Sequence, residues 1–181
     1  MGKRARAGFT LVEMMVAVSI LGVLTATAIP AFSGMVARSK TSEVSANLNS
    51  MFKLASAYYL AERSSQGHSA AATGYCSVDD GGPEPAIPLP RKQKPAFGTD
   101  PSFRALGFSI ADFTYFSYGL ASKTGTGSCA NEPNTPELYT FFAHGDLDGD
   151  GLESTFELSA GSDSNNVLYH SRSYFISQEI E

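Results

Sequence analysis

Hydrophobic positions divide the chain into distinct parts. Residues 9–32 are almost uniformly apolar, and Glu13 is their only ionisable side chain. As a helix this stretch measures about 36 Å, which is enough to cross the hydrocarbon core of a bilayer. Lys3, Arg4 and Arg6 precede it, and basic flanks tend to stay in the cytoplasm. The pattern predicts one membrane-spanning helix with a cytoplasmic N-terminus and with all later residues outside.

A periodic pattern replaces this uniform run after residue 32. Apolar side chains recur at spacings of three and four residues, and charged or amide side chains fill the other positions, as in a helix with one buried face. We therefore expect the helix to continue through residues 33–62 as an amphipathic half that covers one face of a folded domain. The apolar stripe consists of Val44, Leu48, Met51, Phe52, Ala55, Tyr58 and Tyr59.

Turn-forming residues then separate the helix from a strand-rich part. Glycine, proline and serine are concentrated in residues 63–96, which predicts a long irregular loop. Residues 97–181 are predicted to form the sheet region, with one helical turn at 101–107. The expected fold class is α+β, a long N-terminal helix packed on an antiparallel sheet of about four strands. Strand signals cover residues 113–120, 138–143 and 154–158, with shorter segments at 167–169 and 174–176.

Composition and charge exclude several classes of function. The 181 residues are 43% hydrophobic and 17% charged, which is typical of a folded protein. The net charge of −5 provides no basic field, so we do not expect nucleic acid as a partner. The sequence also lacks the G-x-S-x-G, Walker and H-E-x-x-H motifs. We therefore do not expect an enzyme.

The apolar run fits two kinds of export signal. In a cleaved secretory signal, Ala26-Thr27-Ala28 is the small-residue site, and cleavage releases a soluble protein that starts at Ile29. The run before that site is longer than such signals need, it contains Glu13, and apolar residues continue beyond it. In the second interpretation the run is retained and only the basic leader is removed.

The border between the basic leader and the apolar run favours retention. Gly8 ends the leader, Phe9 follows it, and Glu13 is the fifth residue after the border. Together with the long apolar span and Pro30, these residues resemble the processing site of the type IV pilin family, which includes pilins, minor pilins and the pseudopilins of type II secretion. The resemblance covers roughly the first 40 residues and makes residues 1–8 a prepilin leader peptide.

This resemblance implies a processing pathway and a set of partners. Prepilin peptidase is expected to cut after Gly8, and Phe9 is expected to be N-methylated, which leaves residues 9–32 as the transmembrane and assembly half of the helix. The mature chain is then a structural subunit that polymerises through its N-terminal helix into a type IV pilus, or fimbrium, or into a type II secretion pseudopilus. Expected partners are the membrane, other pilin subunits in a homo- or hetero-polymer, the peptidase and the inner-membrane assembly machinery. The precursor is expected in the inner membrane, and the filament in the periplasm or outside the cell.

Glu13 and Pro30 are the two unusual residues of the apolar helix. A carboxylate is costly in hydrocarbon, and the resemblance implies that Glu13 of one subunit pairs with the free α-amino group of Phe9 of the next, which fixes the register of parallel helices. The alternative role is local: Glu13 reaches toward the headgroups and stabilises the start of its own helix. Pro30 removes a backbone donor, so we expect a bend or a loosened turn there.

Cys76 and Cys129 are the only cysteines, and both follow the span on the side expected to be oxidising. A disulfide between them is the economical interpretation, and free buried thiols are the alternative. The bridge is expected to hold the irregular loop against the strand region. Zinc is not expected, because the two cysteines and three histidines show no ligand spacing.

Residues 145–157, GDLDGDGLESTFE, form a candidate metal site. Their acidic residues, with the carbonyl of Leu152, fit the D-x-D-x-D-G-x5-E order of an EF-hand Ca²⁺ loop. Repeated Asp-Gly pairs are equally typical of a tight turn, and the flanks are strand-like. Ca²⁺ is thus the one candidate cofactor, and the alternative function is a membrane-tethered or secreted Ca²⁺-binding module that does not polymerise. The acidic candidate ligands are Asp146, Asp148, Asp150 and Glu157.

Overall fold

The computed structural model describes residues 8–64 and 72–179 of the chain. The predicted leader up to residue 7, with its three basic residues, lies outside the described residues, as do residues 65–71 of the predicted irregular loop. The chain divides into two compact units, Met1–Ala37 and Arg38–Glu181.

The helix α1 spans Leu11–Leu60 and belongs to both units. By length and composition it is able to cross a membrane. Large apolar side chains from Phe9 to Phe32 are 53% to 80% exposed in this chain. Pro30 lies inside the helix, and the helix assignment is unbroken at that position, so the bend expected there stays a prediction.

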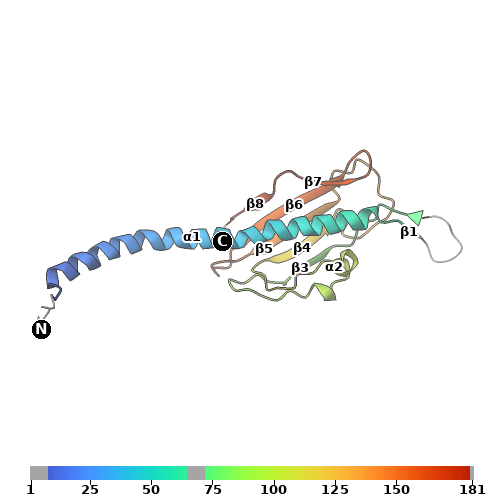
Figure 1. The fold of residues 1–181 in the computed structure, drawn as a ribbon. Helices are drawn as coiled ribbons and strands as arrows, with labels where there is room; N and C mark the ends of the chain where they lie inside the picture. Colours follow the sequence, from blue (N-terminus) through green and yellow to red (C-terminus); the bar gives the residue numbers. More distant parts are fainter. Residues whose placement is uncertain (1–7, 65–71, 180–181) are drawn as a thin grey trace, which may run out of the picture. The chain divides into compact units, whose positions relative to one another are not determined.

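In the second unit α1 is amphipathic, as the sequence predicts. Five residues of the predicted apolar stripe are buried, and the other two, Phe52 and Tyr58, are half-buried. The buried five are Val44, Leu48, Met51, Ala55 and Tyr59. This part of α1 lies along one face of the sheet, crossing β4, β5 and β6 in Figure 1. The helix therefore supplies one layer of the hydrophobic core and the sheet supplies the other.

Several hydrogen bonds fix α1 to this domain, and three of them are spread along the helix. Thr114 Oγ1 donates to Glu43 Oε1 at 2.7 Å, near the start of the unit. Asn47 Nδ2 donates to the Tyr118 hydroxyl at 2.8 Å. Near the end of the helix, the buried Tyr59 hydroxyl donates to Asn166 Oδ1 at 2.8 Å. We call these bonds the three helix ties.

The sheet of the second unit has six strands, so the α+β class is confirmed while the predicted count of about four is too low. All strand pairs are antiparallel, in the order β3-β4-β5-β6-β7, and β8 also pairs with β6. The strands are β3 Gly81–Glu84, β4 Ser117–Ser122, β5 Tyr139–Gly145, β6 Ser154–Ser162, β7 Leu168–His170 and β8 Phe175–Ser177. A separate short pair joins β1 Arg63–Ser64 to β2 Ala72–Thr73.

The strand β3 lies inside the segment predicted as an irregular loop, which corrects that prediction. Its sequence, Gly-Gly-Pro-Glu, consists of residues that are depleted in strands. β3 is at the edge of the sheet, where Pro83 is tolerated because one side of an edge strand needs no backbone donor. Pairing with β4, and a hydrogen bond from Gly82 N to Asp100 Oδ2 at 3.0 Å, hold this segment extended.

The helical turn predicted at residues 101–107 is confirmed as α2, Pro101–Leu106, which follows the 3₁₀ turn η1, Phe97–Thr99. Asp100 caps it, because Oδ1 accepts hydrogen bonds from Ser102 N at 2.8 Å and Phe103 N at 3.3 Å. Gly107 ends the helix with a φ of 71°, a conformation that glycine adopts without strain.

Candidate functional site

The residues at the start of α1 form a reciprocal cap. Glu13 Oε2 accepts hydrogen bonds from the backbone N–H of Thr10 at 2.8 Å and from its hydroxyl at 2.7 Å. In return, Glu13 N donates to Thr10 Oγ1 at 3.3 Å. This is a capping box, in which two side chains satisfy backbone donors that the first helical turn leaves free. Its signal in the sequence is T-L-V-E, which the sequence analysis overlooked.

The predicted processing residues lie immediately before this cap. Gly8 and Phe9 precede the first residue of α1, and Phe9 is 80% exposed. The Gly8–Phe9 border therefore lies outside the helix and is exposed rather than packed against the described residues. These hydrogen bonds agree with one part of the alternative role predicted for Glu13, the stabilisation of its own helix start, while its reach toward the headgroups stays a prediction. Its assembly role concerns a second subunit and stays a prediction.

The predicted disulfide is present between Cys76 and Cys129, and the described residues contain no free cysteine. The backbone pairs the same two segments, because Ser77 N donates to Ser128 O at 2.7 Å. Cys76 N also donates to Tyr59 O at 3.3 Å, which joins the segment to the end of α1. The bridge thus connects the first part of the predicted loop to the segment between β4 and β5, as expected.

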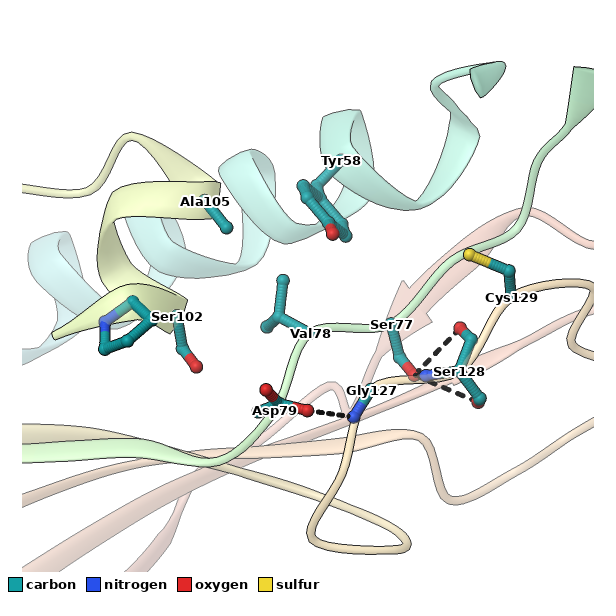
Figure 2. A pocket seen from close by; sticks show the side chains of 10 residues that line it. Tyr58, Ser77, Val78, Asp79, Ser102, Ala105, Gly127, Ser128 and Cys129 are labelled. Atoms are coloured by element: carbon teal, nitrogen blue, oxygen red, sulfur yellow. Dashed lines mark hydrogen bonds between the residues drawn. The ribbon is translucent and has the colours of Figure 1, made fainter. Parts of the chain in front are cut away.

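A cavity of about 370 Å³ lies beside this bridge (Figure 2). Tyr58 reaches it from α1, and Ser102 and Ala105 reach it from α2. Two of its polar side chains make hydrogen bonds across the lining: Asp79 Oδ1 accepts from Gly127 N at 2.5 Å, and Ser128 N donates to Ser77 Oγ at 3.0 Å. These hydrogen bonds hold the two loops together beside the disulfide.

Three aspartates of the candidate metal site converge. Asp146, Asp148 and Asp150 each place one carboxylate oxygen within 4.8 Å of the others, and within residues 8–64 and 72–179 no other group of this kind is found. Each carboxylate also accepts a backbone hydrogen bond of the turn, for example Gly149 N to Asp146 Oδ1 at 2.6 Å. The aspartates therefore cap a tight turn, which was the alternative interpretation, and they also gather oxygen ligands.

Glu157, the expected bidentate Ca²⁺ ligand, is not part of this group. It lies in β6, where its backbone is opposite Phe142 of β5 on one side and Phe175 of β8 on the other. The three converging carboxylate oxygens, one from each aspartate, are fewer than the six to eight oxygens that Ca²⁺ takes. The EF-hand order of residues is thus only partly matched in space.

Comparisons with known proteins find similarity in the N-terminal part of the chain. The model of the prokaryotic N-terminal methylation motif matches residues 3–29. The chain is 44% identical over 52 residues to the type IV major pilin protein PilA of Myxococcus xanthus, a match that covers 29% of this chain and 24% of that protein. It is 49% identical over 41 residues to the fimbrial protein EcpC of Eikenella corrodens (23% and 27%), and 43% identical over 44 residues to the type IV major alpha-pilin of Moraxella bovis (24% and 28%). The N-terminal part of the chain is therefore similar to the N-terminal part of type IV pilins and fimbrial proteins.

The relatives that match are named as pilin or fimbrial proteins. The matched motif includes Gly8, Phe9 and Glu13, so the pilin motif and the capping box coincide. The chain spans about a quarter of the length of the curated relatives it matches. No solved structure matches the chain significantly.

Proposed function

We propose that the chain is a structural subunit of a type IV pilus or of a type II secretion pseudopilus, stored in the membrane and polymerised through the first part of α1. The observation that supports this most is the exposure of the apolar helix. Side chains such as Leu11 and Phe32, 76% and 69% exposed, cannot stay in water and find no partner among the described residues. A bilayer covers them first, and parallel helices of other subunits cover them in a filament.

Processing converts the stored form into the assembling form. Prepilin peptidase cuts between Gly8 and Phe9, where the exposed chain precedes the helix. The cut removes the basic leader and creates an α-amino group on Phe9, which is then N-methylated. The inner-membrane assembly machinery moves the processed subunit into a homo- or hetero-polymer in the periplasm or outside the cell.

The new ammonium group supplies a partner for Glu13. In a bundle of staggered helices the carboxylate of one subunit meets the ammonium of the next, and it exchanges its two Thr10 bonds, at 2.7 and 2.8 Å, for an ion pair. An ion pair in an apolar bundle adds little net stability, but leaving one member alone costs about 3–5 kcal/mol. Registers that separate the two charges are therefore rejected.

Mass measurement of the mature N-terminus tests the processing step. A methylated Phe9 start supports the proposal, whereas a start at Ile29 supports the cleaved secretory signal and a chain that does not polymerise.

Substitution at Glu13 tests the assembly step. Glu13→Gln keeps the shape and a capping oxygen but removes the charge, so the variant should be inserted and processed but poorly incorporated into filaments. Glu13→Asp, which keeps the charge on a shorter side chain, is the matched control and should retain more incorporation. Normal filament yield from Glu13→Gln contradicts the register role.

Ca²⁺ binding by the aspartate turn stays a prediction of the sequence. Calorimetry with Ca²⁺ on the purified chain tests it, with Asp148→Asn as the control because that oxygen belongs to the converging group. Heat that Asp148→Asn abolishes supports Ca²⁺ as a ligand, and no heat at about millimolar Ca²⁺ removes the site.

A further inference from the structure

Two loops of the second unit are tied to the part of α1 with which that unit begins. Glu43 Oε1 accepts hydrogen bonds from Thr114 Oγ1 at 2.7 Å and from Tyr115 N at 3.0 Å. Thr114 in turn exchanges two backbone hydrogen bonds with Gln93, both 2.8 Å long. The segments around residues 87–94 and 112–115 therefore lie beside the first turns of the helix in this unit.

These loops bring basic residues together. The ring of Tyr115 has the ammonium of Lys40 4.5 Å from its centroid and that of Lys92 5.3 Å away. Arg91 and Lys94 are exposed in the same loop as Lys92, and Arg38 is exposed two residues before Lys40. Of the chain's 13 lysines and arginines, three precede the span and ten follow it, so half of those ten gather here. The 17 acidic residues after the span make this concentration stand out from an otherwise acidic domain.

The same loops expose two large apolar side chains. Ile87 is 69% exposed and Phe113 is 55% exposed. Gln93 links both, because its Nε2 donates to Ile87 O at 2.8 Å and its backbone pairs with Thr114, the neighbour of Phe113. We call residues 87–94 and 112–115, with Arg38 and Lys40, the juxtamembrane surface. Apolar tips among basic side chains are typical of protein surfaces that rest on a bilayer interface.

The distance along the chain allows this surface to reach the lipid headgroups. Arg38 is the first charged residue after Glu13, so the helix carries no charge between them. Glu43, where the loops are tied, follows Arg38 by five residues, or about 8 Å along a helix. The headgroup region of one leaflet is roughly 5 to 8 Å thick. Loops tied at Glu43 can therefore reach the headgroups when the apolar run is in the membrane.

We propose that the juxtamembrane surface docks the second unit onto an anionic phospholipid surface while the subunit is stored in the membrane. Lys40 and Lys92 bind lipid phosphates, and Ile87 and Phe113 enter the interface. The inference rests on the membrane-stored state proposed above and adds to it a contact that must be released when the subunit enters a filament. Exposed acidic groups nearby oppose the contact: Asp112 is in the surface itself, and Gly149 of the aspartate turn lies against Pro90.

Tryptophan fluorescence can test this docking, because the chain contains no tryptophan. Phe113→Trp places one reporter in the surface of the full-length chain, reconstituted in nanodiscs of phosphatidylcholine with or without phosphatidylglycerol. Tyr169→Trp is the matched control: Tyr169 is 47% exposed, and it pairs with Gly161 at the end of β6 remote from Ser154 and the loops. Docking predicts that brominated lipid quenches the Phe113→Trp emission, and does so more when phosphatidylglycerol is present, while Tyr169→Trp is not quenched.

Charge variants in the Phe113→Trp background sharpen the result. Each of Lys40→Gln and Lys92→Gln should lower the ratio of docked to undocked domain by about fivefold, and added salt should act in the same direction. Asp148→Asn should raise the ratio. Emission that is equally unquenched in both kinds of nanodisc overturns the proposal. A blue shift that depends on protein concentration instead of lipid charge also overturns it, because that identifies a second copy of the chain as the occupant. A change in emission produced by inorganic phosphate alone overturns it as well.

Processing and filament incorporation are measured on the same variants. Normal Phe9 processing with no lipid quenching rejects the docking and leaves the proposed function intact. Loss of the apolar run from the mature chain rejects both.

Discussion

Two stretches of the same helix solve the problem of apolar side chains in opposite ways. Before Ala37, α1 exposes nearly every large apolar residue, with Leu21 61% exposed. After Arg38 it turns a narrow stripe inward, and Leu48 and Met51 are fully buried. The apolar side chains of the first stretch need cover from outside the chain, whereas those of the second are covered by the chain's own sheet. Substitutions in the first stretch should therefore affect assembly, and substitutions in the second should affect stability.

The largest expected effect is on the stability of the second unit, through loss of its disulfide. Cys76 and Cys129 are 53 residues apart in sequence, so the bridge should contribute about 4 kcal/mol in the chain-entropy model. Replacing both by serine should lower the denaturation midpoint of the second unit, measured by near-UV circular dichroism in detergent. Dithiothreitol added to the unsubstituted chain is the control and should reproduce the loss. A midpoint that neither treatment moves contradicts the prediction.

A pair of matched leucines tests the comparison directly. Leu48→Ala should cost about 3 kcal/mol of unfolding free energy, because it leaves a cavity under the sheet. Leu21→Ala removes the same atoms from an exposed position and should leave unfolding unchanged while reducing filament yield. Urea titration and filament counts measure the two outcomes. Equal losses of stability from both changes would mean that the two stretches do not differ as described.

The pH dependence of unfolding should report on the buried face of the sheet. Burial raises the pKa of the Tyr118 and Tyr139 hydroxyls above the ordinary 10.0, because the charged form is poorly solvated there. Because the fold favours the neutral form, each hydroxyl makes its full contribution to the free energy of unfolding below about pH 10. That contribution is lost as the pH rises toward the raised pKa, so between about pH 9 and pH 11 each tyrosine should lower the free energy of unfolding by about 1 kcal/mol. Tyr118→Phe should remove about half of this pH dependence, and an undiminished dependence would assign it to other groups.

The smallest effect should come from the cap of the exposed stretch. Thr10→Ala removes the reciprocal bonds with Glu13 and should cost about 1 kcal/mol at the start of α1. Faster hydrogen exchange of the first helical amides in detergent measures this, while the midpoint of the second unit should not move. Thr10→Ser keeps the hydroxyl and should restore protection. Unchanged exchange in Thr10→Ala would show that the cap is not used.

Periodic or uniform patterns were predictable from the sequence, and contacts between distant segments were not. The apolar run and the stripe through Leu48 are read from residue spacing alone, and α2 follows from Pro101 and Gly107 at its two ends. β3 was missed because its residues favour turns and only the pairing with β4 makes it a strand. Sequence therefore predicts elements that local chemistry specifies.

The candidate sites divide in the same way. The border at Gly8 and Phe9 consists of adjacent residues and is predictable from the sequence. The cap between Thr10 and Glu13 is equally local, and its T-x-x-E order makes it predictable too. The order of the aspartate turn suggested a complete Ca²⁺ loop, yet the strand pairing of Glu157 keeps that residue out of the converging group. No sequence pattern links Lys40, Lys92 and Tyr115, because they come from three separate segments.

The three helix ties give α1 the properties of a mechanical anchor. Glu43, Asn47 and Tyr59 bond to the rest of the domain at successive positions, and the stripe fills the spaces between them. A force along the axis of α1 acts on the three helix ties at the same time. No single hydrogen bond therefore carries the whole force. The domain is therefore expected to resist separation from the second half of its helix when the chain is pulled.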